Sequence, residues 1–239
     1  MWALTHGSLE PSLFGINFLA NHSNFIAFVI APIYFISQHP FTLIVLKVLS
    51  RVLSGYMIYK IAKEKTDFKT ALLFMGLYFL YPANIFSMIF EFDFESLAPA
   101  LVALTFYFHL KKKYAAFCLS LFLTLLCKEN MAAYAVTFGL YSLFSKDYDK
   151  IKWGMFPILT GIIYFYVVLF IITPHLRNSL SQTKNIYLGS FSWIGNSPNE
   201  VIKSIMNNPM RILQVIICPL NLNYLKELFL PIVLLPIIS

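Results

Sequence analysis

Residues 41–61 read FTLIVLKVLSRVLSGYMIYKI. A membrane-spanning helix needs about 20 mostly apolar residues, and this stretch is long enough. It contains the cations Lys47 and Arg51, and it ends in a lysine cluster that begins at Lys60. An apolar run followed by basic residues is typical of a span that ends on the cytoplasmic side. The stretch therefore predicts a transmembrane helix.

The composition of the whole chain agrees with this interpretation. Of the 239 residues, 59% are hydrophobic and only 12% are charged, and the mean hydropathy is +0.71. A soluble domain of this length has no use for so much apolar surface. We expect an all-α protein, a polytopic transmembrane helical bundle whose partner is the lipid bilayer. The net charge of +7 comes largely from lysines beside apolar runs, so we expect no nucleic-acid partner.

The distribution of lysines predicts the topology. The clearest apolar runs are Phe41–Ile61, Thr70–Phe90, Leu97–Leu110, Tyr114–Cys127, Met131–Phe144, Trp153–Thr173 and Leu225–Ile238. Lysine clusters at 60–69, 111–113 and 146–152 are each separated from the next by two runs, which places all three on the cytoplasmic side. The acidic segment 91–95 should then face outside, as should Lys128-Glu129, which interrupts the apolar sequence between the runs that end at Cys127 and begin at Met131.

We expect a single membrane domain over residues 1–239, integral and multi-pass. Residues 1–40 form an outer loop with an interfacial helix, and 41–173 form the core of the bundle. Residues 174–223 form a second outer loop, and 224–239 form the last span. Within the second loop, Ser197 as N-cap, Pro198 in the first turn and the apolar spacing after them predict an amphipathic helix on the membrane surface.

Lys47 and Arg51 are four residues apart and therefore lie on one face of their helix. Charges inside a membrane usually face a cavity or a partner, so one interpretation is an anion site for a lipid phosphate. The other is a structural ion pair with an outer carboxylate (Glu91, Asp93 or Glu129) or snorkelling to the interface. The sequence leaves both open.

The outer segments carry the other candidate groups. Glu91, Asp93 and Glu95 alternate with phenylalanines, and such carboxylates can bind a divalent cation or act as a general base. They could equally be a solvated loop at a helix end. Lys128 could contact phosphate, or it could pair with Glu129 at a hairpin tip. The remaining outer residues of interest are His22, His175 and Arg177.

A series of short segments follows a recognisable order and spacing along the chain: Met1-Trp2, Thr5-His6-Gly7, Asn21-His22-Ser23, Ala31-Pro32-Ile33-Tyr34, Leu80-Tyr81-Pro82, Phe92-Asp93-Phe94, Cys127-Lys128-Glu129, Pro174-His175, Leu188-Gly189, Gly195-Asn196-Ser197-Pro198 and Asn208-Pro209. In this order the segments resemble a domain-of-unknown-function family of predicted bacterial and archaeal membrane proteins. That family is grouped with the GT-C glycosyltransferases.

The resemblance implies a GT-C-like bundle that uses a polyprenyl-phosphate sugar at the outer face of the plasma membrane of a bacterium or archaeon. The implied catalytic candidates are Asp93, Glu95 and His22. Lys47, Arg51 and Lys128 would contact the phosphate. Glu91, Glu129, His175 and Arg177 would lie near the site, and Asp93 with Glu95 could hold Mg²⁺ or Mn²⁺.

Two departures qualify the resemblance. The related sequences carry a first span and an acid-containing outer loop before the position of Met1, and they continue beyond Ser239, so the chain is expected to be truncated at both ends. They also have histidine where this chain has Glu95. The expected function is a membrane glycosyltransferase or a truncated remnant of one. The alternatives are a non-catalytic scaffold and a transporter subunit, and whether the chain is an enzyme stays open.

Overall fold

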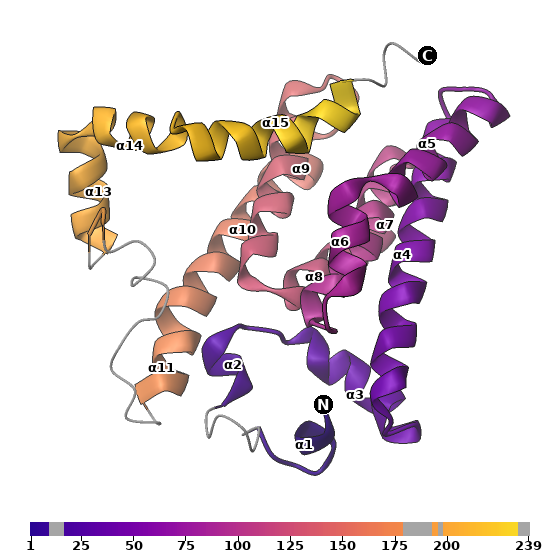
Figure 1. The fold of residues 1–239 in the computed structure, drawn as a ribbon, viewed down its shortest axis with the longest axis horizontal. Helices are drawn as coiled ribbons and strands as arrows, with labels where there is room; N and C mark the ends of the chain where they lie inside the picture. The colour runs from indigo at the N-terminus through magenta and orange to yellow at the C-terminus, as the bar shows by residue number, and fades with distance from the viewer. Residues whose placement is uncertain (10–16, 179–192, 196–197, 234–239) are drawn as a thin grey trace. The chain divides into compact units, whose positions relative to one another are not determined.

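The computed structural model describes residues 1–9, 17–178, 193–195 and 198–233, and all regular structure within them is helical (Figure 1). The chain divides into two compact units, 1–181 and 182–239, which are described separately. The first unit contains α1 (Trp2–Thr5), α2 (Phe18–Asn21), α3 (Ile26–Ile36), α4 (Pro40–Lys63), α5 (Phe68–Leu80), α6 (Pro82–Ile89), the 3-10 turn η1 (Phe94–Leu97), α7 (Ala98–Leu110), α8 (Tyr114–Cys127), η2 (Glu129–Met131), α9 (Ala132–Phe144), the π-helix η3 (Lys150–Met155), α10 (Phe156–Tyr166), η4 (Val167–Ile172) and α11 (Thr173–Asn178).

Helix α4 contains the apolar stretch 41–61 with its two cations, Lys47 and Arg51. The ring of His39 caps it by accepting a hydrogen bond from the Phe41 N–H at 3.1 Å, and Pro40 occupies the first turn, where its missing N–H has no consequence. Within the described residues, two segments are long and apolar enough to cross a membrane, Pro40–Lys63 and Lys150–Leu176, and the bent pair α5–α6 would be a third. The larger number of spans expected from the apolar runs stays a prediction.

The bend between α5 and α6 measures 46°. It falls at Tyr81, whose extended backbone is the conformation favoured before a proline, and Pro82 then starts α6. The break turns α6 and the segment after it back toward α4, where they form one wall of a cavity.

The three lysine clusters meet at one end of the first unit. Lys111, in the turn after α7, pairs with Glu64 at the end of α4 with an N–O distance of 2.7 Å. Lys112 lies over the ring of Tyr148, 5.5 Å from its centroid, beside the third cluster. Two apolar runs separate each lysine cluster from the next, which predicts that all three clusters lie at the same end, and the structure agrees. The side of the membrane on which the lysines lie stays a prediction.

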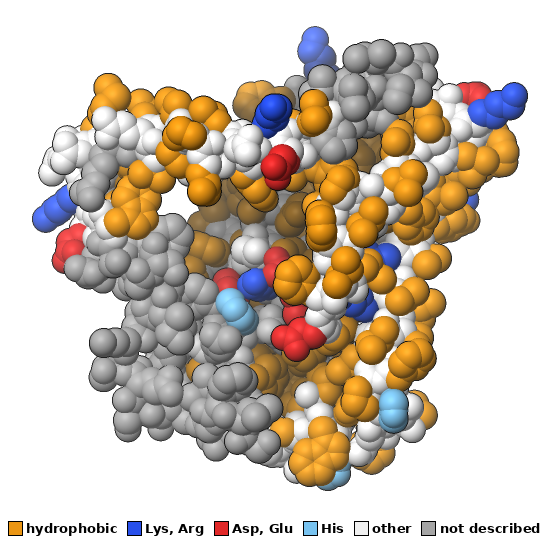
Figure 2. Space-filling model, in the orientation of Figure 1, with side chains coloured by type: hydrophobic (Ala, Val, Ile, Leu, Met, Phe, Trp, Pro, Cys, Tyr) orange, Lys and Arg blue, Asp and Glu red, His pale blue; other side chains and the backbone are white. Residues whose placement is uncertain are grey.

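The core of the first unit lies between α8, α9 and the helix that begins at η3. Phe117 and Leu121 of α8 are fully buried against Ala135 of α9. At Gly139, α9 and η3 approach each other so closely that an added Cβ would lie 2.5 Å from a carbonyl oxygen of η3. In contrast, large apolar side chains on the outer faces of α4 and α5 are exposed, as Figure 2 shows, which suits contact with lipid rather than water.

Helix α3 corresponds to the interfacial helix expected at residues 24–37. One face, which includes Ile26 and Ile30, is buried, and the other, which includes Phe35 and Ile36, is exposed. Its eleven residues are too few to span a bilayer. Its placement at the interface stays a prediction.

The second unit contains α13 (Pro198–Asn207), α14 (Pro209–Ile216) and α15 (Pro219–Val233). The helix predicted to begin at Pro198 is therefore confirmed, whereas its expected cap Ser197 lies outside the described residues. The last span was expected over residues 224–239. Helix α15 covers the first part of that range, and residues 234–239 are not described.

Candidate functional site

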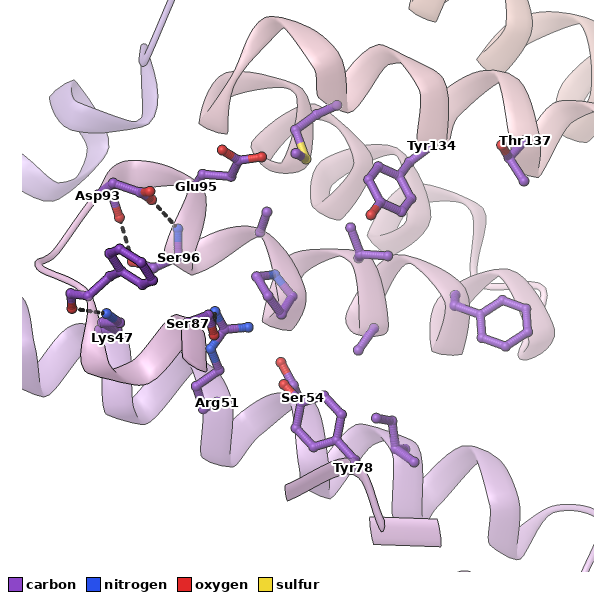
Figure 3. Close-up of a pocket in the computed structure, with 18 of the residues that line it drawn as sticks. Lys47, Arg51, Ser54, Tyr78, Ser87, Asp93, Glu95, Ser96, Tyr134 and Thr137 are labelled. Carbon is purple, nitrogen blue, oxygen red and sulfur yellow. Dashed lines mark hydrogen bonds between the residues drawn. The ribbon is translucent and has the colours of Figure 1, made fainter. Parts of the chain in front are cut away.

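A cavity of about 730 Å³ lies within the first unit, bounded by α4, the bent pair α5–α6, the turn η1, α7 and α9. This volume is typical of small-molecule sites. The cavity is lined by Lys47, Arg51, Ser54, Ile58, Ile61, Tyr78, Ser87, Phe90, Glu91, Asp93, Glu95, Ser96, Ala98, Pro99, Val102, Ala103, Phe106, Met131, Tyr134, Thr137 and Phe138. Figure 3 shows acidic residues at one end of the cavity, Lys47, Arg51 and Tyr78 along one wall, and Tyr134 and Thr137 on the opposite wall.

The lining changes character along α4. Lys47, Arg51, Ser54, Ile58 and Ile61 follow one another at spacings of three or four residues, so they form one stripe along a helix face. At 1.5 Å per residue the stripe is about 21 Å long. It runs from two cations through a hydroxyl to aliphatic side chains, which is the polarity profile of an anionic lipid.

Helix α7 repeats this gradient, because its lining residues after Ser96 are Ala98, Pro99, Val102, Ala103 and Phe106. Helix α9 does not repeat it, because Tyr134 and Thr137 line the cavity beside Phe138. The cavity therefore has its charged groups near η1, and the rest of its lining is mainly apolar with a few hydroxyl groups. Acidic and basic side chains also gather near the centre of the face shown in Figure 2.

Lys47 is almost completely buried, with 3% of its surface exposed. Its ammonium donates to the main-chain carbonyls of Phe90 at 2.6 Å and Glu91 at 3.3 Å. Ser50, one turn further along α4, donates to the carbonyl of Ser96 at 3.1 Å. Helix α4 thus holds both ends of the segment 90–96. Among the described residues, Lys47 forms no ion pair with a carboxylate, so that alternative from the sequence is not observed.

Arg51 is held from α6. Its Nη2 donates to the Ser87 hydroxyl at 2.9 Å, and that hydroxyl in turn donates to the carbonyl of Asn84 at 2.8 Å. The Nε of Arg51 and the hydroxyl of Tyr78 are both buried, and neither has a hydrogen-bond partner among the described residues. Buried polar groups almost always have partners, so two unsatisfied groups on one cavity wall need an explanation.

Asp93 and Glu95 lie at the charged end. Asp93 caps η1 by accepting from the Ser96 N–H at 2.8 Å through Oδ1. Glu95 accepts from Lys128 at 2.6 Å and from Asn130 at 3.2 Å, so both of its oxygens are engaged. Of the two carboxylates, Asp93 retains the oxygen with the fewer partners. Lys128 is bound to the wall of the cavity through Glu95 and is not itself part of the lining.

Glu129 takes part in a different contact. Its carboxylate is buried, with 7% of the residue exposed, and accepts from the His22 ring and the Ser23 N–H, both at 3.2 Å. Burial by itself raises the pKa of Glu129, but the hydrogen bonds from His22, its own backbone and Ser23 outweigh it and lower the pKa to about 2. The pair ties the N-terminal segment to the tip between α8 and α9.

The expected metal site is not supported by the donor set. A Mg²⁺ or Mn²⁺ ion prefers several oxygen ligands, with negative charge around them. Glu95 is already neutralised by Lys128, and Lys47 and Arg51 add positive charge nearby. Over residues 1–9, 17–178, 193–195 and 198–233, no three His, Cys, Asp or Glu side chains come together to hold an ion. A divalent cofactor stays a prediction, and no chemical step is assigned to it.

The structure thus brings together five of the sequence candidates, which line one cavity: Lys47, Arg51, Glu91, Asp93 and Glu95. His22 and Glu129 pair with each other instead, and His175 on α11 is exposed. The side chain of Arg177 lies outside the described part of the chain. The Lys128-Glu129 tip is not paired with itself, because each residue binds a different segment.

Sequence reasoning missed the uncharged polar lining, which consists of Ser54, Tyr78, Ser87, Ser96, Tyr134 and Thr137. Ser54 could have been found, because it continues the stripe of Lys47 and Arg51 at helical spacing. Tyr78 had no such signal, because it reaches the cavity from α5 and no charge pattern marks it.

Together, the apolar helices and the cavity with one charged end describe a helical membrane protein with a candidate site inside its first unit. Residues 2–239 match the family described as Predicted membrane protein (DUF2079), and the chain belongs to this family. No curated protein matches the chain, and no solved structure matches it.

Proposed function

We propose that the chain is a GT-C-like membrane glycosyltransferase that takes a polyprenyl-phosphate-linked sugar at the outer face of the membrane. The observation that carries the proposal is the polarity gradient of the cavity. Arg51 and Lys47 lie at the end where a lipid phosphate would sit, and Ile58, Ile61 and Phe106 lie where its chain would run. The short sequence segments resemble a family that is grouped with the GT-C glycosyltransferases, and this resemblance supports the same assignment.

In the proposed reaction an acceptor hydroxyl attacks the anomeric carbon of the sugar. The bond between that carbon and the phosphate oxygen breaks, and the lipid phosphate leaves with the electron pair. Cations beside the leaving oxygen favour this step because negative charge develops there. Arg51 is placed for that role. The proton of the acceptor hydroxyl passes to a carboxylate, which acts as general base.

Asp93 is the better candidate for the base. Both oxygens of Glu95 already accept hydrogen bonds, from Lys128 and Asn130, whereas the cap formed by Asp93 uses Oδ1. A carboxylate held by a cation is a weaker base, since the cation stabilises its charged form. His22 is less suited because it is bound to Glu129 and does not line the cavity.

The test is transfer of a labelled sugar in proteoliposomes, with polyprenyl-phosphate mannose and polyprenyl-phosphate glucose as donors. Asp93→Asn should lower turnover by about 100-fold or more, a loss in the range usual for a general base. Glu64→Gln is the matched control, because Glu64 is an acid at the opposite end of α4. Normal turnover in Asp93→Asn would refute the assignment of the base.

Two other functions make different predictions. A non-catalytic scaffold predicts that Lys47→Ala and Asp93→Ala change stability and that no donor is consumed. A transporter subunit predicts movement of the labelled amphiphile across the bilayer without cleavage of its sugar. Measuring both cleavage and movement in the same vesicles separates the three functions.

A further inference from the structure

The two cations of the cavity do not have the same role. The hydrogen bonds of Lys47 go to main-chain carbonyls at the end of α6, and the side chain is almost fully buried. Main-chain carbonyls left free after a helix end need a donor when they are buried, and Lys47 supplies one. Its ammonium therefore forms hydrogen bonds that stabilise the fold.

Arg51 is in a different situation. One guanidinium nitrogen is held by Ser87, and that hydroxyl is itself oriented by the Asn84 carbonyl, so the fork has a fixed direction. The Nε of Arg51 is buried without a partner among the described residues. A guanidinium offers donors in a planar fork that matches two oxygens of a phosphoryl group, so this arrangement is prepared for an anion.

Tyr78 supplies a second, independent observation. It comes from α5, and Figure 3 shows its ring beside Ser54, on the same side of the cavity as Arg51. Its hydroxyl is also buried without a partner among the described residues. A buried phenol normally finds a hydrogen-bond partner. Arg51 and Tyr78 line the same cavity, so an anion that enters it, and toward which both side chains turn, would supply acceptors for both unsatisfied donors.

We infer that Arg51 and Tyr78 form the anion subsite of the cavity, which takes a phosphoryl group, and that Ser87 orients Arg51 while Lys47 anchors the segment 90–96. The inference rests on the proposed function only in taking the cavity as the ligand site, and it does not require sugar transfer. It assigns a role to Tyr78, which the charge pattern of the sequence does not reveal.

The experiment compares the binding of farnesyl phosphate and farnesol to the purified full chain in detergent. The two probes have the same hydrocarbon chain and differ only in the phosphoryl group. Inorganic phosphate is added as a competitor in a third arm. The measured quantity is the ratio of the two dissociation constants, because a general loss of folded protein affects both probes alike.

In the unmodified protein, farnesyl phosphate should bind more tightly than farnesol. Arg51→Gln should weaken farnesyl phosphate about 30-fold and Tyr78→Phe about tenfold, with farnesol unchanged, since each removes a hydrogen bond to a charged ligand. Tyr78→Phe keeps the ring and should not lower the unfolding temperature, so it remains informative if Arg51→Gln folds poorly. The controls are Lys60→Gln, on the same helix as Arg51, and Tyr107→Phe, and both should leave the ratio unchanged.

Lys47→Gln should leave the ratio unchanged and instead increase hydrogen exchange at the Ser96 amide, which lies in the anchored segment. Lys47→Arg, which keeps a cationic donor, should restore most of the protection. If Lys47→Gln lowers the ratio as much as Arg51→Gln does, and exchange at Ser96 does not change, the assignment of roles is wrong.

The outcomes separate this inference from the proposed function. If the unmodified protein does not distinguish the two probes, the phosphate site of the proposed function fails. If the unmodified protein does distinguish the two probes, but the ratio of dissociation constants is the same in Arg51→Gln and Tyr78→Phe as in the unmodified protein, the inference alone fails. If inorganic phosphate competes as well as farnesyl phosphate binds, the anion subsite stands and the lipid part of the proposed function is refuted.

Discussion

The replacement of Glu129 by glutamine tests how the N-terminal segment is attached to the helices. Glu129 lies between α8 and α9, and it accepts hydrogen bonds from His22 and from the Ser23 N–H, more than 100 positions earlier in the sequence. An ionised carboxylate can only accept, so the ring nitrogen of His22 must donate. Glu129→Gln removes the negative charge but keeps the shape of the side chain.

The size of the effect follows from the pKa. The hydrogen bonds to Glu129 lower its pKa from 4.5 to about 2 despite the burial of the carboxyl. At about 1.4 kcal/mol per pKa unit, the upper limit is about 3.4 kcal/mol, and partial exposure of His22 reduces it to about 2 kcal/mol. Because the folded pKa is depressed, this stability is fully present above about pH 4.5 and is lost as the pH falls toward 2.

The assay is thermal unfolding in detergent, followed by tryptophan fluorescence. At pH 7 Glu129→Gln should lower Tm by about 4–8 °C, since 1 kcal/mol corresponds to about 2–4 °C in a chain of this size. The gap between variant and unmodified protein should close as the pH falls below 4.5. Glu64→Gln is the control, because the Glu64–Lys111 pair is exposed and such pairs contribute little. The reasoning is refuted if Glu129→Gln is no less stable than Glu64→Gln at pH 7.

Two further predictions concern packing and topology. Gly139→Ala should destabilise the protein by about 1–3 kcal/mol, because the new Cβ would lie 2.5 Å from a carbonyl of η3, whereas Gly76→Ala, with nothing within 4 Å, should be neutral or stabilising. Equal unfolding temperatures for the two variants would contradict the close approach. Single cysteines at Lys65 and Lys112, in a background without other cysteines, should react with an impermeant maleimide from the cytoplasmic side only. A cysteine at Asn130 should react from the opposite side only, and labelling of all three from one side would rule out the topology.

Much of the helical framework could be predicted because its signals are local. Pro40 occupies the first turn of α4, where His39 supplies a cap, and Pro198 occupies the first turn of α13. Lys47 and Arg51 share a face because of helical spacing alone. Their position near the acidic segment 91–95 followed from the alternation of apolar runs and lysine clusters.

The pairing of side chains within the site could not be predicted, because it depends on backbone geometry. Lys128 is extended, and successive side chains of an extended chain point in opposite directions. It therefore binds Glu95, while its neighbour Glu129 binds His22. The position of Ser87 beside Arg51 depends on the 46° bend between α5 and α6, an angle that no sequence pattern specifies.

The bend between α5 and α6 also affects how mutational scans of this family should be interpreted. Near the break, main-chain carbonyls are satisfied by side chains: Asn84 donates to the carbonyl of Tyr78, and Lys47 to that of Phe90. Unsatisfied carbonyls are costly in an apolar environment, so Asn84 and Lys47 should tolerate few substitutions even in a protein that binds nothing. The hydroxyl of Tyr78 satisfies no group among the described residues. Selection against Tyr78→Phe would therefore indicate a ligand rather than a requirement for folding.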